Sequence, residues 1–431
     1  MNIAIGRGVL TNALIQFVSL ASGIILARAL GPTGRGDLAV ALFWPQVIAS
    51  VSSLGTEISV ARAVGRNPRS ALEIVGVAIA LSMLLGAIGI IVAHAAMPFL
   101  LGVSKLHLLA QSEIALVAVP FSLLNIYVAS VFLGLGTFAA YNWARFLFYP
   151  IYCLAILLLW AMSSTTTETI VLAFVGAAAL AATANTVTCI GGLERSHKQS
   201  FARNATDLLT LSRGNVVSFF VLVCYVHVPM LLLTRLESTD GIGLFVVASS
   251  VAAAIAVFTG AASKVYFSEA TRLTTMQEMT NLVAGVRKVL ALSVVILVIL
   301  EFVTPMLIPF IFGAEFAAAA ILAAVLLVVS GISGASNVMD DLLKGRGFTH
   351  PGIGARLAYI FIVLMGTSVE YGLTLSQSLA CAMLAGALVE YGIIGRAVAR
   401  VSGLRVIDVI LPAMEDFREM WRYLMGRVRA R

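Results

Sequence analysis

The stretch LARALGPTGRGDL, from Leu26 to Leu38, returns in altered form as LTRLESTDGIGLF, from Leu233 to Phe245. Arg28 corresponds to Arg235, and each of these arginines lies at the edge of an apolar segment. The chain therefore consists of two related halves. Duplicated apolar halves with matching polar residues are typical of transporters whose site lies between the repeats. Two pairs of glycines also match, Gly34 with Gly241 and Gly36 with Gly243.

A second repeated stretch supports the same division of the chain. GLGTFAAYNWAR, from Gly134 to Arg145, corresponds to GRGFTHPGIGAR, from Gly345 to Arg356. Both stretches have two glycines separated by one residue, followed by an arginine at the same distance. Paired glycines between apolar segments predict a turn. We therefore expect each half to contain a glycine turn that leads into a helix carrying one arginine.

The composition places the chain in a membrane. Hydrophobic residues make up 60% of it, charged residues only 11%, and the mean hydropathy is +1.01. Apolar runs of about 20 residues, enough to cross about 30 Å of hydrocarbon, recur along the whole sequence. We predict an all-α polytopic membrane protein. The four cysteines lie inside apolar runs, without the spacing of a disulfide framework or a metal site, so we expect no metal and no cofactor.

About twelve transmembrane helices are expected, in two six-helix bundles related by pseudo-two-fold symmetry. The predicted domains are residues 1–199, residues 200–400 and a basic amphipathic cytoplasmic tail, 401–431. Because each bundle has six helices, both bundles enter the membrane from the same face. The axis that relates them is then expected to run along the membrane normal, with a central cavity between the bundles. The predicted helices lie near residues 8–28, 38–61, 72–98, 107–133, 140–161, 169–192, 213–235, 242–263, 287–310, 316–342, 352–371 and 377–399.

The distribution of lysine and arginine predicts the orientation. If the N-terminus is cytoplasmic, only four of the 28 basic residues lie on the outer side: Arg28, Arg35, Lys105 and Arg235. Such an imbalance favours cytoplasmic N- and C-termini. Topology and attraction to anionic lipid then account for the net charge of +7, so no nucleic-acid partner is expected.

Arginines at matching places are the predicted substrate-binding residues. Arg28 and Arg235 are expected near the outer rim of the cavity, and Arg145 and Arg356 near its inner rim. Guanidinium groups suit the oxygens of phosphate groups, so the substrate is predicted to be anionic and phosphorylated. An alternative stays open, because arginines near helix ends also extend to the membrane surface without binding a substrate.

Acidic residues inside the apolar segments suggest ion coupling. Glu57, Glu301 and Glu390 are the candidates, since ionisable groups are costly within a bilayer. Asp340 and Asp341 precede Lys344 by one helical turn, which predicts local ion pairs. The chain has no GxxxxGK[ST] motif for a nucleotide, so the energy of transport is expected to come from an ion gradient, the membrane potential or later use of the substrate.

The stretch RALGPTGRGDLAVAL, from Arg28 to Leu42, follows NALIQFVSLASGIILA. Together they resemble the opening of bacterial lipid-linked oligosaccharide flippases, in the polysaccharide transport branch of the multidrug/oligosaccharidyl-lipid/polysaccharide exporter superfamily. The resemblance implies that an undecaprenyl-pyrophosphate-linked oligosaccharide crosses the bacterial inner membrane by alternating access around a cationic cavity. The product would be O-antigen of lipopolysaccharide, capsule or exopolysaccharide. It also implies a role for Arg28, contact with membrane lipid, and a polysaccharide polymerase with chain-length machinery as partners.

Two other functions are alternatives to the flippase. An ion-coupled multidrug antiporter of the same superfamily would carry acidic residues in its cavity, and Glu57, Glu301 and Asp340 keep this alternative open. A membrane-embedded polysaccharide-modifying enzyme would need an extended outer loop or a catalytic histidine with a partner. The predicted outer loops are short and no histidine has such a partner, so we expect no enzymatic activity.

Overall fold

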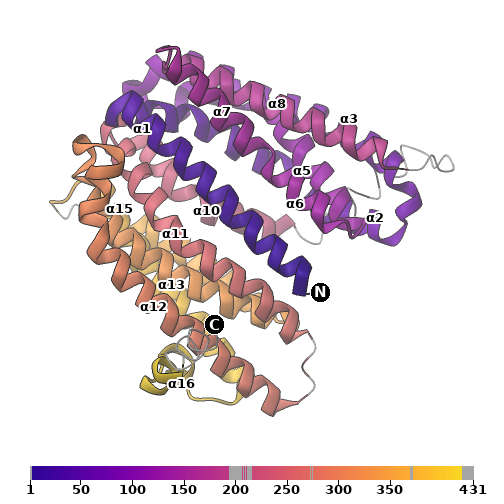
Figure 1. The fold of residues 1–431 in the computed structure, drawn as a ribbon, viewed down its shortest axis with the longest axis vertical. Coiled ribbons are helices and arrows are strands. Elements are labelled where there is room, and N and C mark those ends of the chain that lie inside the picture. Colours follow the sequence, from indigo (N-terminus) through magenta and orange to yellow (C-terminus); the bar gives the residue numbers. More distant parts are fainter. Residues whose placement is uncertain are drawn as a thin grey trace, which may run out of the picture. The chain divides into compact units, whose positions relative to one another are not determined.

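The computed structural model describes residues 2–193, 216–271, 273, 275–368 and 372–419, together with residues 206, 208 and 210. All regular elements in this part of the chain are helices (Figure 1). Nine helical segments of this part, with α6 and α7 together counted as one, are long and apolar enough to cross a membrane, and a tenth span results if the bent pair α4 and α5 is counted as one. The prediction of an all-α polytopic membrane protein is confirmed. The helices are α1 (Asn2–Ser53), α2 (Thr56–Arg66), α3 (Ala71–Leu100), α4 (Leu109–Leu116), α5 (Ala118–Gly134), α6 (Phe138–Phe146), α7 (Phe148–Ala161), α8 (Thr167–Gly191), α10 (Val216–Leu236), α11 (Thr239–Ala270), α12 (Met276–Phe312), α13 (Ala319–Gly345), α14 (His350–Gly366), α15 (Leu375–Ser402) and α16 (Val406–Ile410).

The long helix α1 contains two membrane-crossing arms. Its 52 residues correspond to about 78 Å, more than twice the thickness of the hydrocarbon. The arms meet at Gly31, whose φ of 65° interrupts the helix, and Pro32 begins the second arm. The predicted loop GPTGRGD is therefore helical apart from Gly31. When the two arms and the shorter apolar helix α14 are counted separately, the twelve predicted segments are all present.

Two predicted spans are bent next to a proline. Between α4 and α5 the chain bends by 41° at Val117, three residues before Pro120. The helix is interrupted again at Leu147, between α6 and α7 and three residues before Pro150. Proline has no N–H to donate to the preceding turn, and its ring collides with the carbonyl four residues earlier. The breaks therefore follow from the sequence.

The predicted glycine turns are present in both repeats and have the same hydrogen bonds. Gly136 has a φ of 72° and Gly347 has a φ of 89°, which a residue with a side chain adopts only with strain. Each turn ends a helix with the two backbone bonds of a Schellman motif. The bonds are Thr137 N to Phe132 O at 3.0 Å and Gly136 N to Leu133 O at 3.0 Å, and Phe348 N to Leu343 O at 2.9 Å and Gly347 N to Lys344 O at 2.9 Å.

Two compact units make up the chain, Met1–Val246 and Val247–Arg431. Helix α10 and the first residues of α11 thus belong to the first unit. The division into 1–199 and 200–400 follows the sequence repeat and stays a prediction. Of the predicted tail, residues 414–419 are helical, and residues 420–431 lie outside the described residues. The loop between the halves, 194–212, lies outside them as well apart from residues 206, 208 and 210.

Each unit has its own buried apolar core. In the first unit, Leu38, Ile156 and Ile170 are fully buried in a cluster contributed by α1, α4, α5, α7 and α8. In the second unit, Met339 and Ile394 belong to a cluster contributed mainly by α12, α13 and α15. Many other large apolar side chains are exposed on the helices, as expected of helices whose outer faces contact lipid.

Candidate functional site

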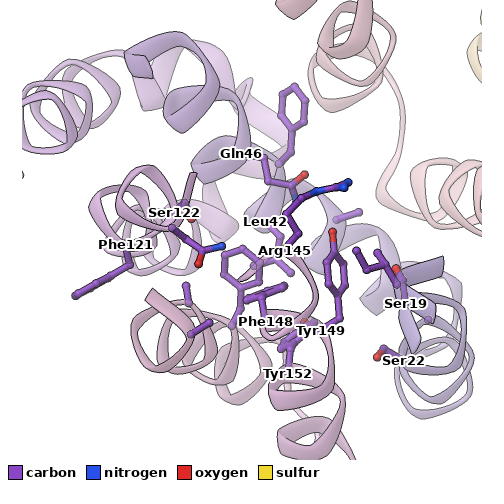
Figure 2. A pocket seen from close by; sticks show the side chains of 18 of the residues that line it. Ser19, Ser22, Leu42, Gln46, Phe121, Ser122, Arg145, Phe148, Tyr149 and Tyr152 are labelled. Atoms are coloured by element: carbon purple, nitrogen blue, oxygen red, sulfur yellow. The ribbon is translucent and has the colours of Figure 1, made fainter. Parts of the chain in front are cut away.

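A cavity of about 690 Å³ lies within the first unit. Both arms of α1 and the helices α5, α6, α7 and α8 form its wall, and Met230 of α10 and Val246 of α11 complete it. Figure 2 shows the side chains of Arg145, Tyr149, Ser19 and Ser22 among those that line the cavity. The polar residues that line the cavity are Ser19, Ser22, Arg35, Gln46, Ser122, Asn125, Arg145, Tyr149 and Tyr152.

Arg145 is the predicted substrate-binding residue that the structure places in this cavity. It lies in α6, two turns after the glycine turn at Gly136. The buried side chain of Asn185, on α8, donates hydrogen bonds to the carbonyl of Ala144 at 3.0 Å and to the side-chain oxygen of Asn125 at 2.7 Å. These bonds fix the backbone of α6 directly before Arg145. Asn185 is therefore a positioning residue.

Arg35 also lines the cavity, although the sequence predicted no binding role for it. Its Nε atom is buried and has no hydrogen-bond partner in the described part of the chain, and the same is true of the Tyr152 hydroxyl. Buried polar groups are normally hydrogen-bonded, so two such groups in one cavity favour a bound ligand or water as their partner. Arg35 lies within the first repeated stretch, but its counterpart in the second half is Ile242.

The charge of the cavity is positive. Two arginines line it, and no aspartate or glutamate is among its lining residues in the described part of the chain. Guanidinium groups without a carboxylate partner can form charge-assisted hydrogen bonds to an anionic ligand. Aromatic residues lie beside them, and Phe148 stacks on Tyr152 with 5.6 Å between the ring centroids. The cavity thus combines a site for an anion with an amphipathic aromatic wall.

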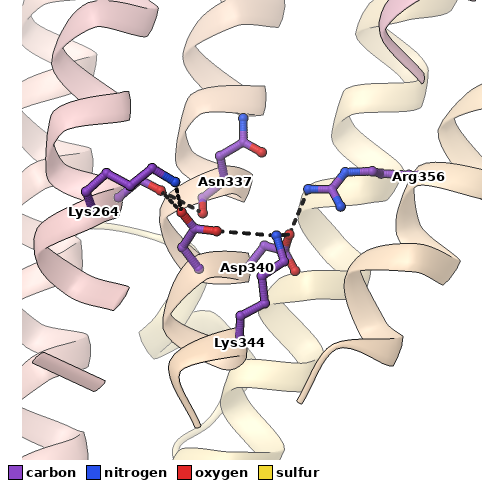
Figure 3. Close-up of polar contacts among 7 residues, drawn as sticks. Lys264, Asn337, Asp340, Lys344 and Arg356 are labelled. Atoms are coloured by element: carbon purple, nitrogen blue, oxygen red, sulfur yellow. Dashed lines mark hydrogen bonds and ion pairs between the residues drawn. The ribbon is translucent and has the colours of Figure 1, made fainter. Parts of the chain in front are cut away.

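Arg356, the repeat counterpart of Arg145, has a different environment. In the second unit its Nη2 lies 2.7 Å from Oδ2 of Asp340, a residue with 0% exposure (Figure 3). Lys344 lies 2.6 Å from the same carboxylate and 3.3 Å from Asp341, so the predicted local ion pairs are confirmed. The position that matches Asp340 in the first half holds Ala129, which, like Arg145, lines the cavity. One arginine is thus neutralised in its repeat and the other is not.

The structure does not bring Arg28 and Arg235 into the cavity. Both side chains are exposed, and neither residue is among those that line it. Arg235, near the end of α10, donates a hydrogen bond to the carbonyl of Phe99 at the end of α3. Of the four predicted arginines, the structure therefore places only Arg145 at the cavity wall, and it places Arg35 there in addition.

The three predicted coupling carboxylates are not among the residues that line the cavity. In α2 of the first unit, Glu57 has a buried Oε2 without a hydrogen-bond partner in the described residues, and Oε1 of Glu301 in α12 is in the same state. Glu390 lies in α15 with 1% exposure. Within the described residues, no group of three His, Cys, Asp or Glu side chains could hold a metal ion.

Comparison with known proteins shows which solved structures share this fold. No family model and no curated protein matches the sequence. Among solved structures, the lipid II flippase MurJ in an inward closed conformation is similar with a TM-score of 0.75 and 12% identity, over 99% of this chain and 93% of that one. An inward-facing MATE family multidrug resistance transporter of the MOP superfamily has a TM-score of 0.67 and 14% identity, over 92% and 99% of the two chains.

The MATE multidrug transporter DinF-BH is similar as well, with a TM-score of 0.61 and 14% identity over 94% of this chain and 96% of that one. Identities this low support the fold and leave the substrate open. The lining of the cavity, and not the fold, must therefore distinguish a lipid flippase from a multidrug transporter. The chain is an all-α polytopic membrane protein with the fold shared by the MurJ lipid II flippase and the MATE transporters.

Proposed function

We propose that this protein moves an undecaprenyl-pyrophosphate-linked oligosaccharide across the bacterial inner membrane by alternating access, for the synthesis of a surface polysaccharide. The observation that carries the proposal is the cavity of the first unit, which Arg35 and Arg145 line and which has no carboxylate among its lining residues. Paired guanidinium groups suit a pyrophosphate, because each can form two parallel hydrogen bonds to phosphate oxygens.

The neutral part of the lining supports the same substrate. Serine, asparagine and glutamine side chains offer hydrogen bonds to hydroxyl groups, and the ring of Tyr149 presents an apolar face with a polar end. In the proposal, Arg145 and Arg35 hold the phosphate groups. Arg28, exposed on the first arm of α1, meets the substrate before it enters. Arg356 is excluded from binding by its ion pair with Asp340.

The alternative is an ion-coupled multidrug antiporter, and similarity to MATE transporters supports it. Such a transporter would need a carboxylate at the cavity to hold a cationic drug, whereas Glu57 and Glu301 do not line the cavity. The two proposals therefore predict opposite preferences for the charge of the substrate.

Reconstitution into proteoliposomes tests the proposal. A fluorescent undecaprenyl-pyrophosphate-linked oligosaccharide is incorporated, and its movement between leaflets is followed with an enzyme that cleaves only external glycan. We expect the protein to accelerate the movement, and Arg145→Ala to slow it about ten- to a hundredfold through loss of one charge-assisted contact. Arg66→Ala removes an exposed arginine of α2 away from the cavity and should have no effect. Movement no faster than in empty liposomes, or equal rates for Arg145→Ala, would contradict the proposal.

A further inference from the structure

The two repeats touch each other at the turn where α1 is interrupted, and they do so reciprocally. A Cβ atom at Gly36 would overlap the carbonyl oxygen of Thr239, and a Cβ atom at Gly243 would overlap that of Pro32. Gly36 matches Gly243 in the repeat, and Pro32 matches Thr239. All four residues belong to the first compact unit. The matching glycines therefore allow two backbones to meet in a symmetric contact that no other residue type would permit.

Side chains from the same two stretches meet beside the glycines. The hydroxyl of Thr33 donates to Oδ1 of Asp240 at 3.4 Å, and these two residues are 207 positions apart, like the glycines. Residues that match in a repeat contact each other only close to the axis that relates the copies. The contact of Pro32–Gly36 with Thr239–Gly243 thus lies on the local symmetry axis.

Two basic residues connect neighbouring helix ends at this contact. Lys105 has 1% exposure, and its Nζ donates to the carbonyl of Thr234 at 2.8 Å and to that of Glu237 at 2.6 Å, at the end of α10. In return, Arg235 of α10 donates to the carbonyl of Phe99 at the end of α3. Cations are favourable at helix C-termini, where carbonyl groups lack helical partners. The end of α10 therefore binds Lys105, which follows α3, and the end of α3 binds Arg235 of α10.

This contact adjoins the lining of the cavity. Arg35 lines the cavity, and its neighbour Gly36 contacts Thr239. Lys105 and Arg235 donate these hydrogen bonds to backbone carbonyls, and water can replace such acceptors when the segments separate.

We propose that Lys105 and Arg235 form a latch that holds the cavity shut, with the Gly36–Gly243 contact as its closing surface. Loss of either cation shifts the protein towards the state in which this contact is open. The proposal rests on the proposed function only in that a transporter must open here. Its test measures access to the cavity without any substrate, so the two proposals fail separately.

Access is measured with a membrane-impermeant sulfonated maleimide. Cys153, Cys189, Cys224 and Cys381 are replaced by serine, and Ala39→Cys provides one reactive thiol in the cavity lining. Labelling rates are recorded from both faces, in intact cells and in inside-out vesicles. We expect Lys105→Met and Arg235→Met to raise the rate from one face about tenfold and to lower it from the other. Lys105→Arg and the exposed-site control Arg66→Met should match the parent. Unchanged rates in both methionine variants would show that the two cations are static helix caps.

A second measurement leaves Lys105 and Arg235 intact, so it holds even if their variants fold poorly. Thr33→Cys and Asp240→Cys are introduced together with the Ala39→Cys reporter, and copper phenanthroline is used to form a disulfide between the first two positions. We expect the disulfide to abolish labelling of the reporter from one face, and reduction to restore it. Labelling that continues from both faces in the fully cross-linked protein would overturn the latch.

Discussion

At the scale of single residues, one difference between the repeats gives two matching arginines different environments. Asp340 lies 2.7 Å from Arg356, whereas the repeat position that matches Asp340 in the first half holds Ala129. The positive charge of Arg356 is already paired with a buried carboxylate and is therefore less available to an anionic ligand. The first repeat thus keeps a guanidinium available to the cavity, and the second uses its own in a structural ion pair.

The substitution Ala129→Asp would copy this ion pair into the first repeat. We expect translocation of the lipid-linked oligosaccharide to fall about ten- to a hundredfold, because Arg145 would lose its contact to phosphate. Ala129→Asn adds nearly the same volume without charge and serves as the control. The proteoliposome assay gives both rates. If Ala129→Asp and Ala129→Asn slow translocation equally, the effect comes from the added side-chain volume and not from the added charge.

Repeat matching singled out Arg145 through its counterpart Arg356, and the structure places Arg145 in the lining of the cavity, while its role in substrate binding stays a prediction. Arg35 was not predicted, since Ile242 occupies the matching position and breaks the symmetry. The ion pair of Arg356 with Asp340 could not be predicted either, because the two residues are 16 positions apart and lie on different helices. A binding site that is formed by one repeat alone has no matching residues in the other repeat, so a comparison of the two repeats cannot find it.

At the scale of elements, the glycine turns carry a prediction about stability. Gly136 and Gly347 have positive φ, so Gly136→Ala and Gly347→Ala should each lower the free energy of unfolding by about 1–2 kcal/mol. Gly354 lies inside α14 with open space around it, so Gly354→Ala should be neutral or stabilising. Thermal unfolding of the purified protein in detergent measures all three. A Gly136→Ala or Gly347→Ala variant as stable as Gly354→Ala would contradict the assignment of the turns.

Elements were predictable where the chain carries local signals. The glycine turns and the bend near Pro120 follow from residue type alone, and both are observed. The predicted loop between Arg28 and Leu38 was wrong, because Pro32 fits the first turn of a helix and only Gly31 leaves helical geometry. Gly36 is required by the close approach of the Thr239 carbonyl.

At the scale of the whole molecule, composition sufficed to predict a polytopic membrane protein. The compact units could not be read from the repeat, since the first extends to Val246 and includes α10. By sequence, helix α10 belongs to the second half, but in the structure it contacts α1. A sequence repeat shows which segments are related and does not show which segments pack together. Orientation in the membrane remains a prediction of the basic residues.

The predicted orientation can be tested with two thiols. Ser164→Cys and Ser238→Cys, each in a chain without its native cysteines, should react with an impermeant maleimide added to intact cells, because both positions follow predicted outward-running helices. Arg66→Cys should react only after permeabilisation. The reverse pattern would place both termini outside.

Energy coupling is a further prediction at this scale. We expect translocation to respond to a protonophore, to sodium or to the membrane potential, with Glu57, Glu301 and Glu390 as the residues that mediate the response. Glutamine at the responsible position should leave a basal rate that no longer depends on the gradient. If transport into vesicles by the parent protein does not change with a protonophore, with sodium or with the membrane potential, the prediction of ion coupling is wrong.

The central claim is that the cavity of the first unit binds an anionic lipid-linked saccharide through Arg35 and Arg145. Equilibrium binding to the purified protein tests it most directly, with an undecaprenyl-pyrophosphate-linked oligosaccharide compared with a cationic multidrug-transporter substrate. We predict that the parent protein prefers the anionic lipid and that Arg35→Ala and Arg145→Ala each weaken its binding about ten- to a hundredfold, whereas Arg66→Ala has no effect. Preference for the cationic compound, or unchanged binding of the lipid when both cavity arginines are replaced, would contradict the account.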